Sequence, residues 1–295
     1  MFQTVIVPLD GSPLAAHALD YAAQVANPGA HLMLVAVVDI PVDDGFRASH
    51  EKAVAEMVSH SRDALVHELT ARAESLQAKG FRVTTTIRTG DTTEEILRCA
   101  ADARADLIVM ASHGAGGVSR WLLGSVTNRV LHATTIPVFV ARTRQFGEPP
   151  TMDAIVVPLD GSRFAESAIP GAAALAARLA IPMQFVRVVR SQSVISHTTL
   201  LTDIAMLRDL AEHERSTAAI YLETIVAQFA DGAVDAAAQV LVGNPPEQLA
   251  DYLASRPRAL VVMTTHGATG AARSIFGSIT EKLLAVMPNP ALVLH

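Results

Sequence analysis

The 295-residue sequence is poor in several residue types, and each shortage excludes a class of protein. Its single cysteine, Cys99, rules out an intramolecular disulfide and any metal site built from several thiolates. The chain holds only three lysines and no basic block, and its net charge is -6, so binding of nucleic acid through a broad basic surface is not expected. No apolar run approaches the roughly 18 residues that a membrane span requires. We therefore expect neither nucleic acid nor a membrane as a partner.

Short apolar runs between polar segments are the main feature that the sequence does have. Examples are VIVPL, LMLVAVV, DLIVMA and IPVFVA. Runs of this length suit the strands of a parallel sheet whose two faces are both buried. The N-terminal residues, MFQTVIVPLD, lack the basic region and the long apolar core of a signal peptide, which favours a cytoplasmic protein.

The chain also contains its own copy. VPLDGS occurs at 7–12 and again, unchanged, at 157–162. The segments 110–126 and 263–279 share eight identical residues, including a histidine, an arginine and a Gly-Ser pair. A repeat of this length indicates a duplicated domain. We predict one domain over 1–143, a polar, proline-bearing linker over 144–152 and a second domain over 153–295.

Within one copy, predicted strands and helices alternate. The first helix is expected to open at Ser12-Pro13, a good cap followed by a good first-turn residue. Further helices are predicted over 48–78, 92–103 and 125–133, and strands over 4–9, 31–38, 82–88, 106–111 and 136–141. Five strands with helical crossovers predict an α/β fold built on a parallel, doubly wound sheet. Pro8 and Pro158 cannot donate to a ladder and are placed at the C-terminal ends of their strands.

Residues suited to binding a ligand fall at one edge of this sheet. Asp10 follows the first strand and the loop SHGAGG follows the fourth, and these strands can be neighbours where the winding changes direction. Glycines let backbone amides approach a ligand closely. Gly124-Ser125 then opens the last helix, whose free amides and positive dipole end attract phosphate. An aspartate opposite could accept hydrogen bonds from ribose hydroxyls or hold a metal ion carried by phosphates.

Each motif also has a purely structural interpretation. Asp10 and Asp160 could shape the turn into the following helix. Ser278 with Glu281 has the spacing of a capping box, and Ser125 begins a near version. Taken singly these interpretations are favoured, but the duplication of all motifs at fixed spacing on one sheet edge favours a site.

Together, VPLDGS and the glycine segment resemble the universal stress protein family. The spacing from Gly114 to Gly124 recurs from Gly267 to Gly277, and the resemblance covers essentially the whole chain as two tandem domains. It implies a Rossmann-like fold of the adenine nucleotide alpha hydrolase type, with ATP, with or without Mg²⁺, at the sheet edge described above. The family has a glycine where this sequence has Ala111 and Thr264.

The resemblance also implies which residues contact the nucleotide. The aspartates would meet the nucleoside, the backbone after the second strand would meet adenine, and the glycine segments would hold phosphates. In the first copy these are Pro8, Asp10, Val38, Asp39, Ala111, Ser112, His113, Gly114, Gly117, Arg120, Gly124, Ser125 and Val126. In the second copy they are Pro158, Asp160, Val189, Thr264, His266, Gly267, Gly270, Arg273, Gly277, Ser278 and Ile279. Arg190 stands where the first copy has Asp39, so the two sites differ.

Three functions remain open at this point. The first is an ATP-binding stress regulator whose output is its binding state, with at most slow hydrolysis. The second is an ATP-hydrolysing or phosphotransferring enzyme, although the chain has no Gly-Lys-Ser/Thr phosphate loop and no G-x-S-x-G motif. Neither glycine segment holds a lysine, but Arg120 and Arg273 could neutralise a γ-phosphate; no catalytic residue or metal ligand is assigned. The third is a scaffold without ligand, which the intact glycines of both copies disfavour.

The last strands predict how the domains associate. Similar proteins pair through this strand, so IPVFVA and NPALVLH are expected to pair within one chain as an internal pseudo-dimer. An exposed sheet edge would otherwise invite aggregation. A homodimer of whole chains is also expected.

Overall fold

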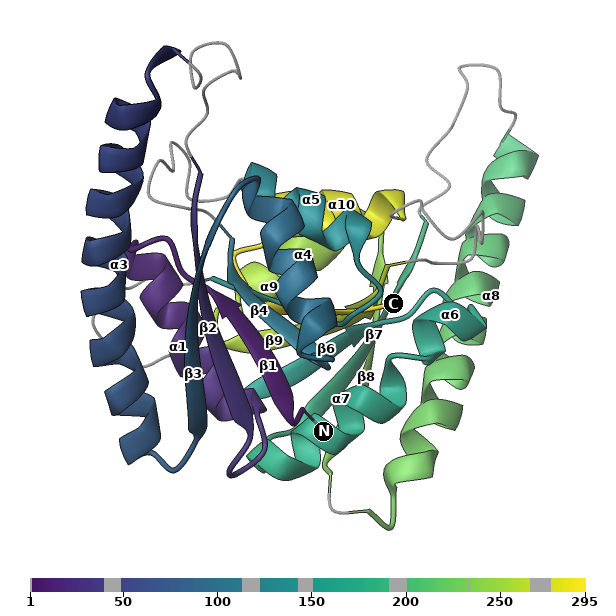
Figure 1. The fold of residues 1–295 in the computed structure, drawn as a ribbon. Coiled ribbons are helices and arrows are strands. Elements are labelled where there is room, and N and C mark those ends of the chain that lie inside the picture. Colours follow the sequence, from purple (N-terminus) through teal and green to yellow (C-terminus); the bar gives the residue numbers. More distant parts are fainter. Residues whose placement is uncertain are drawn as a thin grey trace. The chain divides into compact units, whose positions relative to one another are not determined.

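The computed structural model describes residues 2–39, 49–112, 123–142, 151–190, 201–232, 234–265 and 277–295 (Figure 1). Contacts between Cα atoms divide the chain into two compact units, Met1–Pro150 and Thr151–His295. Each unit is an α/β domain, described below by itself. No helix within the described ranges is long and apolar enough to cross a membrane.

Unit 1 is a five-stranded parallel sheet with helical crossovers. Its strands are β1 (Thr4–Pro8), β2 (His31–Val38), β3 (Arg82–Thr89), β4 (Leu107–Ala111) and β5 (Val138–Ala141). Its helices are α1 (Pro13–Val25), α3 (Glu51–Ala78), α4 (Thr92–Asp102) and α5 (Ser125–Ala133). The strand order is β3-β2-β1-β4-β5, with all neighbours parallel. The winding changes direction between β1 and β4, which confirms the doubly wound sheet predicted from sequence.

Unit 2 repeats this arrangement with one change in its first crossover. Its strands are β6 (Ala154–Pro158), β7 (Met183–Val189), β8 (Ala236–Val242), β9 (Ala259–Thr264) and β10 (Ala291–Leu294), in the order β8-β7-β6-β9-β10. Its helices are α6 (Arg163–Glu166), α7 (Ile169–Leu179), α8 (Leu201–Val226), α9 (Pro245–Ala254) and α10 (Ser278–Val286), with a 3₁₀ turn at Ala227–Phe229. The crossover that is one helix in unit 1 is divided here into α6 and α7. Pro170 lacks the amide hydrogen that a continuous helix would need at that point.

The central strands of each sheet are buried on both faces. Val5, Ile6 and Val7 of β1 are completely buried, as are the corresponding residues of β6. Full burial of one such side chain stabilises the fold by about 1.5–3 kcal/mol. Cys99 on α4 is 1% exposed and belongs to the core.

Element boundaries follow the local chemistry of the chain. Pro8 and Pro158 are the last residues of β1 and β6, as predicted, so their missing amides fall where the chain leaves the ladder. At the other end of β1, the carboxylate of Asp106 accepts hydrogen bonds from the amides of Gln3 (2.7 Å) and Thr4 (3.1 Å). The start of β1 is thereby fixed to the start of β4.

Candidate functional site

The Asp-Gly-Ser turn after β1 is built from three complementary interactions. The Ser12 amide donates to Oδ1 of Asp10 over 3.0 Å, and the Ala15 amide donates to Oγ of Ser12 over 3.1 Å. Gly11 lies between them at φ +80°, in the left-handed region that favours glycine. Ser12 is therefore the N-cap of α1, as predicted, and Asp10 shapes the turn.

Unit 2 builds the same turn after β6. The Ser162 amide donates to Oδ1 of Asp160 over 2.9 Å, and Gly161 has φ +88°. The structural interpretation of both aspartates is thus confirmed. Each aspartate is also exposed at the C-terminal edge of its sheet. Because a carboxylate can accept several hydrogen bonds, its place in the turn is compatible with contact to a ligand.

The last helix of each unit begins at a glycine rather than a serine. Gly124 is the N-cap of α5 and Gly277 is the N-cap of α10, so Ser125 and Ser278 are the first helical residues. The capping-box interpretation of these serines was therefore wrong. Among the described residues no side chain caps either helix, whereas α1 and α4 are capped by serine and aspartate.

Two hydrogen bonds fix the start of α5 to the end of β4. The Gly124 amide donates to the carbonyl of Ser112 over 2.6 Å, and Oγ1 of Thr127 donates to the carbonyl of Ala111 over 2.8 Å. The first intrahelical bond is Asn128 N to Gly124 O, at 2.8 Å. The amides of residues 125–127 precede that bond, and they give the helix terminus its partial positive charge.

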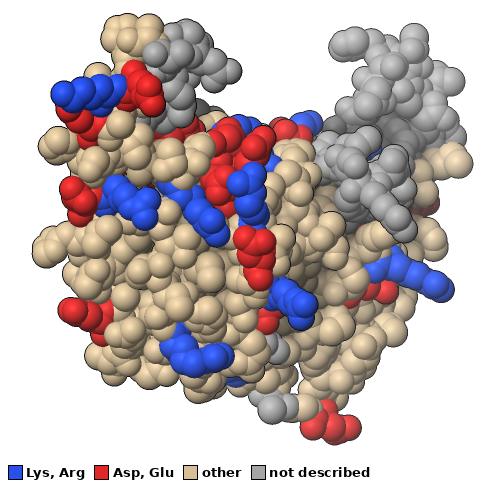
Figure 2. All heavy atoms as spheres, viewed as in Figure 1, with Lys and Arg blue, Asp and Glu red and all other residues tan. Residues whose placement is uncertain are grey.

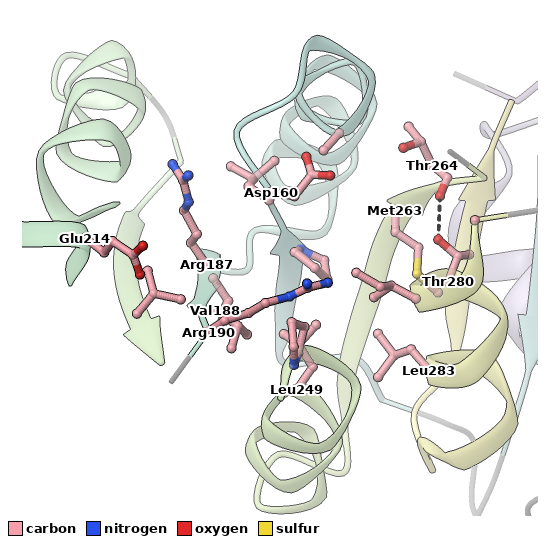
Figure 3. Close-up of a pocket in the computed structure, with 18 of the residues that line it drawn as sticks. Asp160, Arg187, Val188, Arg190, Glu214, Leu249, Met263, Thr264, Thr280 and Leu283 are labelled. Atoms are coloured by element: carbon pink, nitrogen blue, oxygen red, sulfur yellow. Dashed lines mark hydrogen bonds between the residues drawn. The ribbon is translucent and has the colours of Figure 1, made fainter. Parts of the chain in front are cut away.

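The start of α10 is fixed to the end of β9 in the same way. The Gly277 amide donates to the carbonyl of Thr265 over 2.6 Å, and Oγ1 of Thr280 donates to the carbonyl of Thr264 over 3.1 Å (Figure 3). The sequence analysis missed Thr127 and Thr280. The available signal was their identical place in the two copies, Gly-Ser-Val-Thr and Gly-Ser-Ile-Thr.

A cavity of about 640 Å³ opens at this edge of unit 2, between the C-terminal ends of its strands and the start of α10 (Figure 3). Its volume lies within the range of small-molecule sites. Six of the predicted site residues line it, namely Pro158, Asp160, Val189, Thr264, Gly277 and Ile279. Leu249, Met263 and Leu283 give it an apolar side. The structure thus brings these residues of four separate elements together.

The other predicted residues divide into two groups. In unit 1 the described residues lie at the corresponding ends of β1, β2 and β4 and at the start of α5: Pro8, Asp10, Val38, Asp39, Ala111, Ser112, Gly124, Ser125 and Val126. Ser278 occupies the first position of α10. Eight others lie outside the described residues, namely His113, Gly114, Gly117, Arg120, His266, Gly267, Gly270 and Arg273.

Two arginines also line the cavity of unit 2. Arg187 was not singled out in the sequence, and its guanidinium lies over the ring of Tyr221, 4.8 Å from the centroid. The Tyr221 hydroxyl donates to Oε1 of Glu166 over 2.8 Å. Burial, and then the bond to Glu166, raise the pKa of Tyr221 above its ordinary value, so the phenol stays protonated. Arg190 follows the end of β7 and reaches into the cavity from the opposite side to Asp160 (Figure 3).

The edge combines a helix terminus, a carboxylate and apolar side chains. Within the described ranges, no group of three or more His, Cys, Asp or Glu side chains is placed to hold a metal. The edge instead offers a helix terminus for an anion, an aspartate for hydroxyl donors and an apolar side for a flat ring. Such an edge can contact a ligand that combines an anionic group, hydroxyl groups and a flat ring.

Known proteins resemble the chain over both units. A sequence profile of the universal stress protein family matches residues 1–142 and 152–295. Universal stress protein YxiE of Bacillus subtilis is 30% identical over 148 residues, which are 48% of this chain and 100% of that protein. A universal stress protein of Methanocaldococcus jannaschii is 30% identical over 157 residues, 49% of this chain and 97% of that protein.

A solved structure has the same fold along nearly the whole chain. It is a universal stress protein from Archaeoglobus fulgidus, with a TM-score of 0.66 and 19% identity, and the match covers 99% of this chain and 98% of that one. The Rossmann-like α/β fold predicted from the resemblance is therefore confirmed. The two profile matches, one to each unit, place this chain in the universal stress protein family as a tandem member.

Proposed function

We propose that this protein is a cytoplasmic stress-response regulator that binds adenine nucleotides, ATP included, at the sheet edge of each unit. Its output is the bound or empty state rather than turnover. One observation carries the proposal. The start of α10, which no described side chain caps, opens on the same cavity as Asp160 and the end of β7. Membership of the universal stress protein family supports it.

Different residues of the cavity contact the phosphates, the ribose and the adenine of the nucleotide. Amides of the first turn of α10 hold the phosphates, because a helix N-terminus attracts anions without a lysine. The carboxylate of Asp160 accepts from ribose hydroxyls. The adenine ring lies against the end of β7, near Val189, with Leu249 and Leu283 as apolar neighbours. In unit 1 the same roles fall to α5, Asp10 and Val38. Where Mg²⁺ is present, it accompanies the phosphates.

Native mass spectrometry of the purified full-length chain, followed by calorimetric titration with ATP and Mg²⁺, tests the proposal. We expect up to two adenine nucleotides per chain. A chain that neither carries nor binds one is a scaffold without ligand. Rapid phosphate release that requires Mg²⁺ would instead make the protein an enzyme.

The role of the helix amides in holding phosphate is tested by replacing both N-cap glycines by valine. Gly124 has φ -63° and Gly277 has φ -62°, so a β-branched residue is accommodated without backbone strain. The new side chains would occupy the space in front of the helix amides. We expect the double variant to keep the circular dichroism spectrum of the parent but to lose nucleotide binding. Undiminished affinity for ATP would refute the assignment of the amides.

We also infer that the two units pair through β5 and β10 as an internal pseudo-dimer, and that whole chains dimerise. β5 ends the strand order of unit 1 and β10 ends that of unit 2. Light scattering of the full chain after size-exclusion chromatography measures the dimer. A particle of 31.2 kDa at all concentrations would contradict chain dimerisation.

A further inference from the structure

The two units differ in charge at corresponding positions near the C-terminal ends of β2 and β7. The Leu9 amide donates to the carbonyl of Val35, and the Leu159 amide donates to that of Val186, both over 2.8 Å. This equivalence aligns β2 with β7 residue by residue. Two pairs then differ in charge: Ala36 aligns with Arg187, and Asp39 aligns with Arg190. Unit 2 therefore presents two guanidinium groups where unit 1 has a buried alanine and an exposed carboxylate.

Arg187 lies directly beside the turn that carries Asp160. A Cβ atom added at Gly161 would lie 3.1 Å from Nη1 and 3.2 Å from Nη2 of Arg187. Asp160 and Arg187 both line the cavity, and Figure 3 shows Arg187 between Glu214 and Asp160. The guanidinium is thus placed next to the turn from which the Asp160 carboxylate enters the cavity.

The guanidinium of Arg187 is positioned by an aromatic ring. Its contact is the face of Tyr221, and the Tyr221 hydroxyl is held by Glu166. Asp160 and Glu214 line the same cavity, yet in the described parts of the chain neither Arg187 nor Arg190 forms an ion pair with a carboxylate. Stacking on a ring fixes the plane of a guanidinium and leaves its N–H groups directed outward. Such a planar donor set binds phosphates and carboxylates through two parallel bonds, and the phosphate of a bound nucleotide is the anion that this cavity would bring to it.

We propose that unit 2 binds adenine nucleotides that carry a phosphate on the ribose, and that Arg187 is the ligand of that phosphate. The inference rests on the proposed function, because it requires the ribose to lie at Asp160. In nucleotide-binding sheets an acidic residue accepts from a ribose hydroxyl, and a nearby arginine accommodates a phosphate at that position. Here one hydroxyl donates to Asp160 and the phosphorylated one meets Arg187. Arg190 adds positive charge from the opposite side of the cavity.

Unit 1 is expected to lack this preference. Ala36 is completely buried and supplies no donor. Asp39 is exposed at the end of β2, where its Oδ2 accepts from the hydroxyl of Thr92 over 3.3 Å. A carboxylate at this position repels a second phosphate, so unit 1 favours nucleotides phosphorylated only at the 5′ position.

Calorimetric titration of the full chain with three ligands tests the proposal. ADP, adenosine 2′,5′-bisphosphate and adenosine 3′,5′-bisphosphate each contain one adenosine and two phosphate groups. The two phosphomonoesters of a bisphosphate carry more negative charge at neutral pH than the diphosphate of ADP, so the contribution of Arg187 itself is taken from its variants. We expect one class of site to bind at least one bisphosphate about tenfold more tightly than ADP, as one charge-assisted pair of bonds allows. The preference should weaken with salt.

Variants at Arg187 assign the preference to its side chain. Arg187→Ala introduces the residue of unit 1, and Arg187→Met keeps an apolar stem over Tyr221 if the shorter variant fails to fold. Both should lose the preference and retain binding of ADP. Arg215→Ala is the matched control, because Arg215 does not line the cavity and pairs with Glu212. It should leave the preference intact.

The outcomes separate the two proposals. If ADP binds but neither bisphosphate is preferred, or the preference survives in both Arg187 variants, the inference is wrong and the proposed function stands. If no adenine nucleotide binds the parent chain, the proposed function fails and the inference fails with it. A preference that is lost in the Arg187 variants and kept in Arg215→Ala supports the inference.

Discussion

Replacing Thr280 by valine removes one hydroxyl and nearly preserves the shape of the side chain. That hydroxyl donates to the carbonyl of Thr264 over 3.1 Å, and Thr280 is 8% exposed. A hydrogen bond of this kind contributes about 0.5–1.5 kcal/mol to stability. We expect Thr280→Val to lower the free energy of unfolding by about 1 kcal/mol.

The loss should affect nucleotide binding in addition to stability. The Thr280 hydroxyl and the Gly277 amide both attach the first turn of α10 to the end of β9. Without the threonine bond, the amides that face the cavity are held less firmly, and part of the binding energy is spent on ordering them. A loss of about 1 kcal/mol would weaken ATP binding roughly fivefold.

Urea unfolding and calorimetric titration of the same samples measure both effects. Thr280→Ser keeps the hydroxyl and is the matched control, so it should restore most of the affinity. The corresponding Thr127→Val should act in the same way on unit 1, whose bond is 2.8 Å long. If Thr280→Val loses stability but binds ATP with unchanged affinity and stoichiometry, the positioning role of this threonine is refuted.

Three further substitutions test the structural account. Gly161→Ala should lower the free energy of unfolding by about 1–2 kcal/mol, because alanine is strained at φ +88°; a urea midpoint equal to that of the parent would contradict this. Asp106→Ala removes the acceptor of two amides at the start of β1, and should destabilise by about 1–3 kcal/mol in the same assay; a neutral effect would show that water replaces the carboxylate. Asp91→Ala should destabilise at neutral pH and do so progressively less in acid. The amide of Glu94, and then Arg129, lower the pKa of Asp91 in the folded state, so its contribution is present above the ordinary pKa of 3.8 and is lost as the pH falls through the folded value. The urea midpoints of Asp91→Ala and of the parent are compared between neutral pH and pH 3. A difference between the two midpoints that stays constant over this range would contradict the prediction.

Much of the fold could be predicted because the strands are short, buried and separated by polar helices. The apolar run at β2 has the bounds of the strand, and Ser12-Pro13 opens α1 as its chemistry requires. Because the domain is duplicated, this pattern of strands and helices occurs twice in the chain. The divided crossover in unit 2 was not foreseen, although Pro170 marks it, because a proline near a helix start is equally compatible with one continuous helix.

The site was less accessible to sequence reasoning because its contacts join distant segments. Thr127 and Thr280 act on carbonyls 16 residues earlier in the chain, which local patterns do not reveal. Gly124 is the N-cap although a serine follows it, since its amide is bound to the end of β4. Arg187 lies inside an apolar strand sequence, MQFVRVV, where its place at the open edge of the sheet and its stacking on Tyr221 become evident only in three dimensions.

The most direct test of the central claim is to follow the backbone amides of residues 278–280 by ¹H–¹⁵N NMR while ATP, and separately adenosine, is added to the full chain. We predict that ATP shifts these amide protons downfield, as expected for new bonds to phosphate, and that adenosine leaves them nearly unchanged while shifting the end of β7. If ATP binds and these amides do not respond, or respond equally to adenosine, the helix terminus is not the phosphate site.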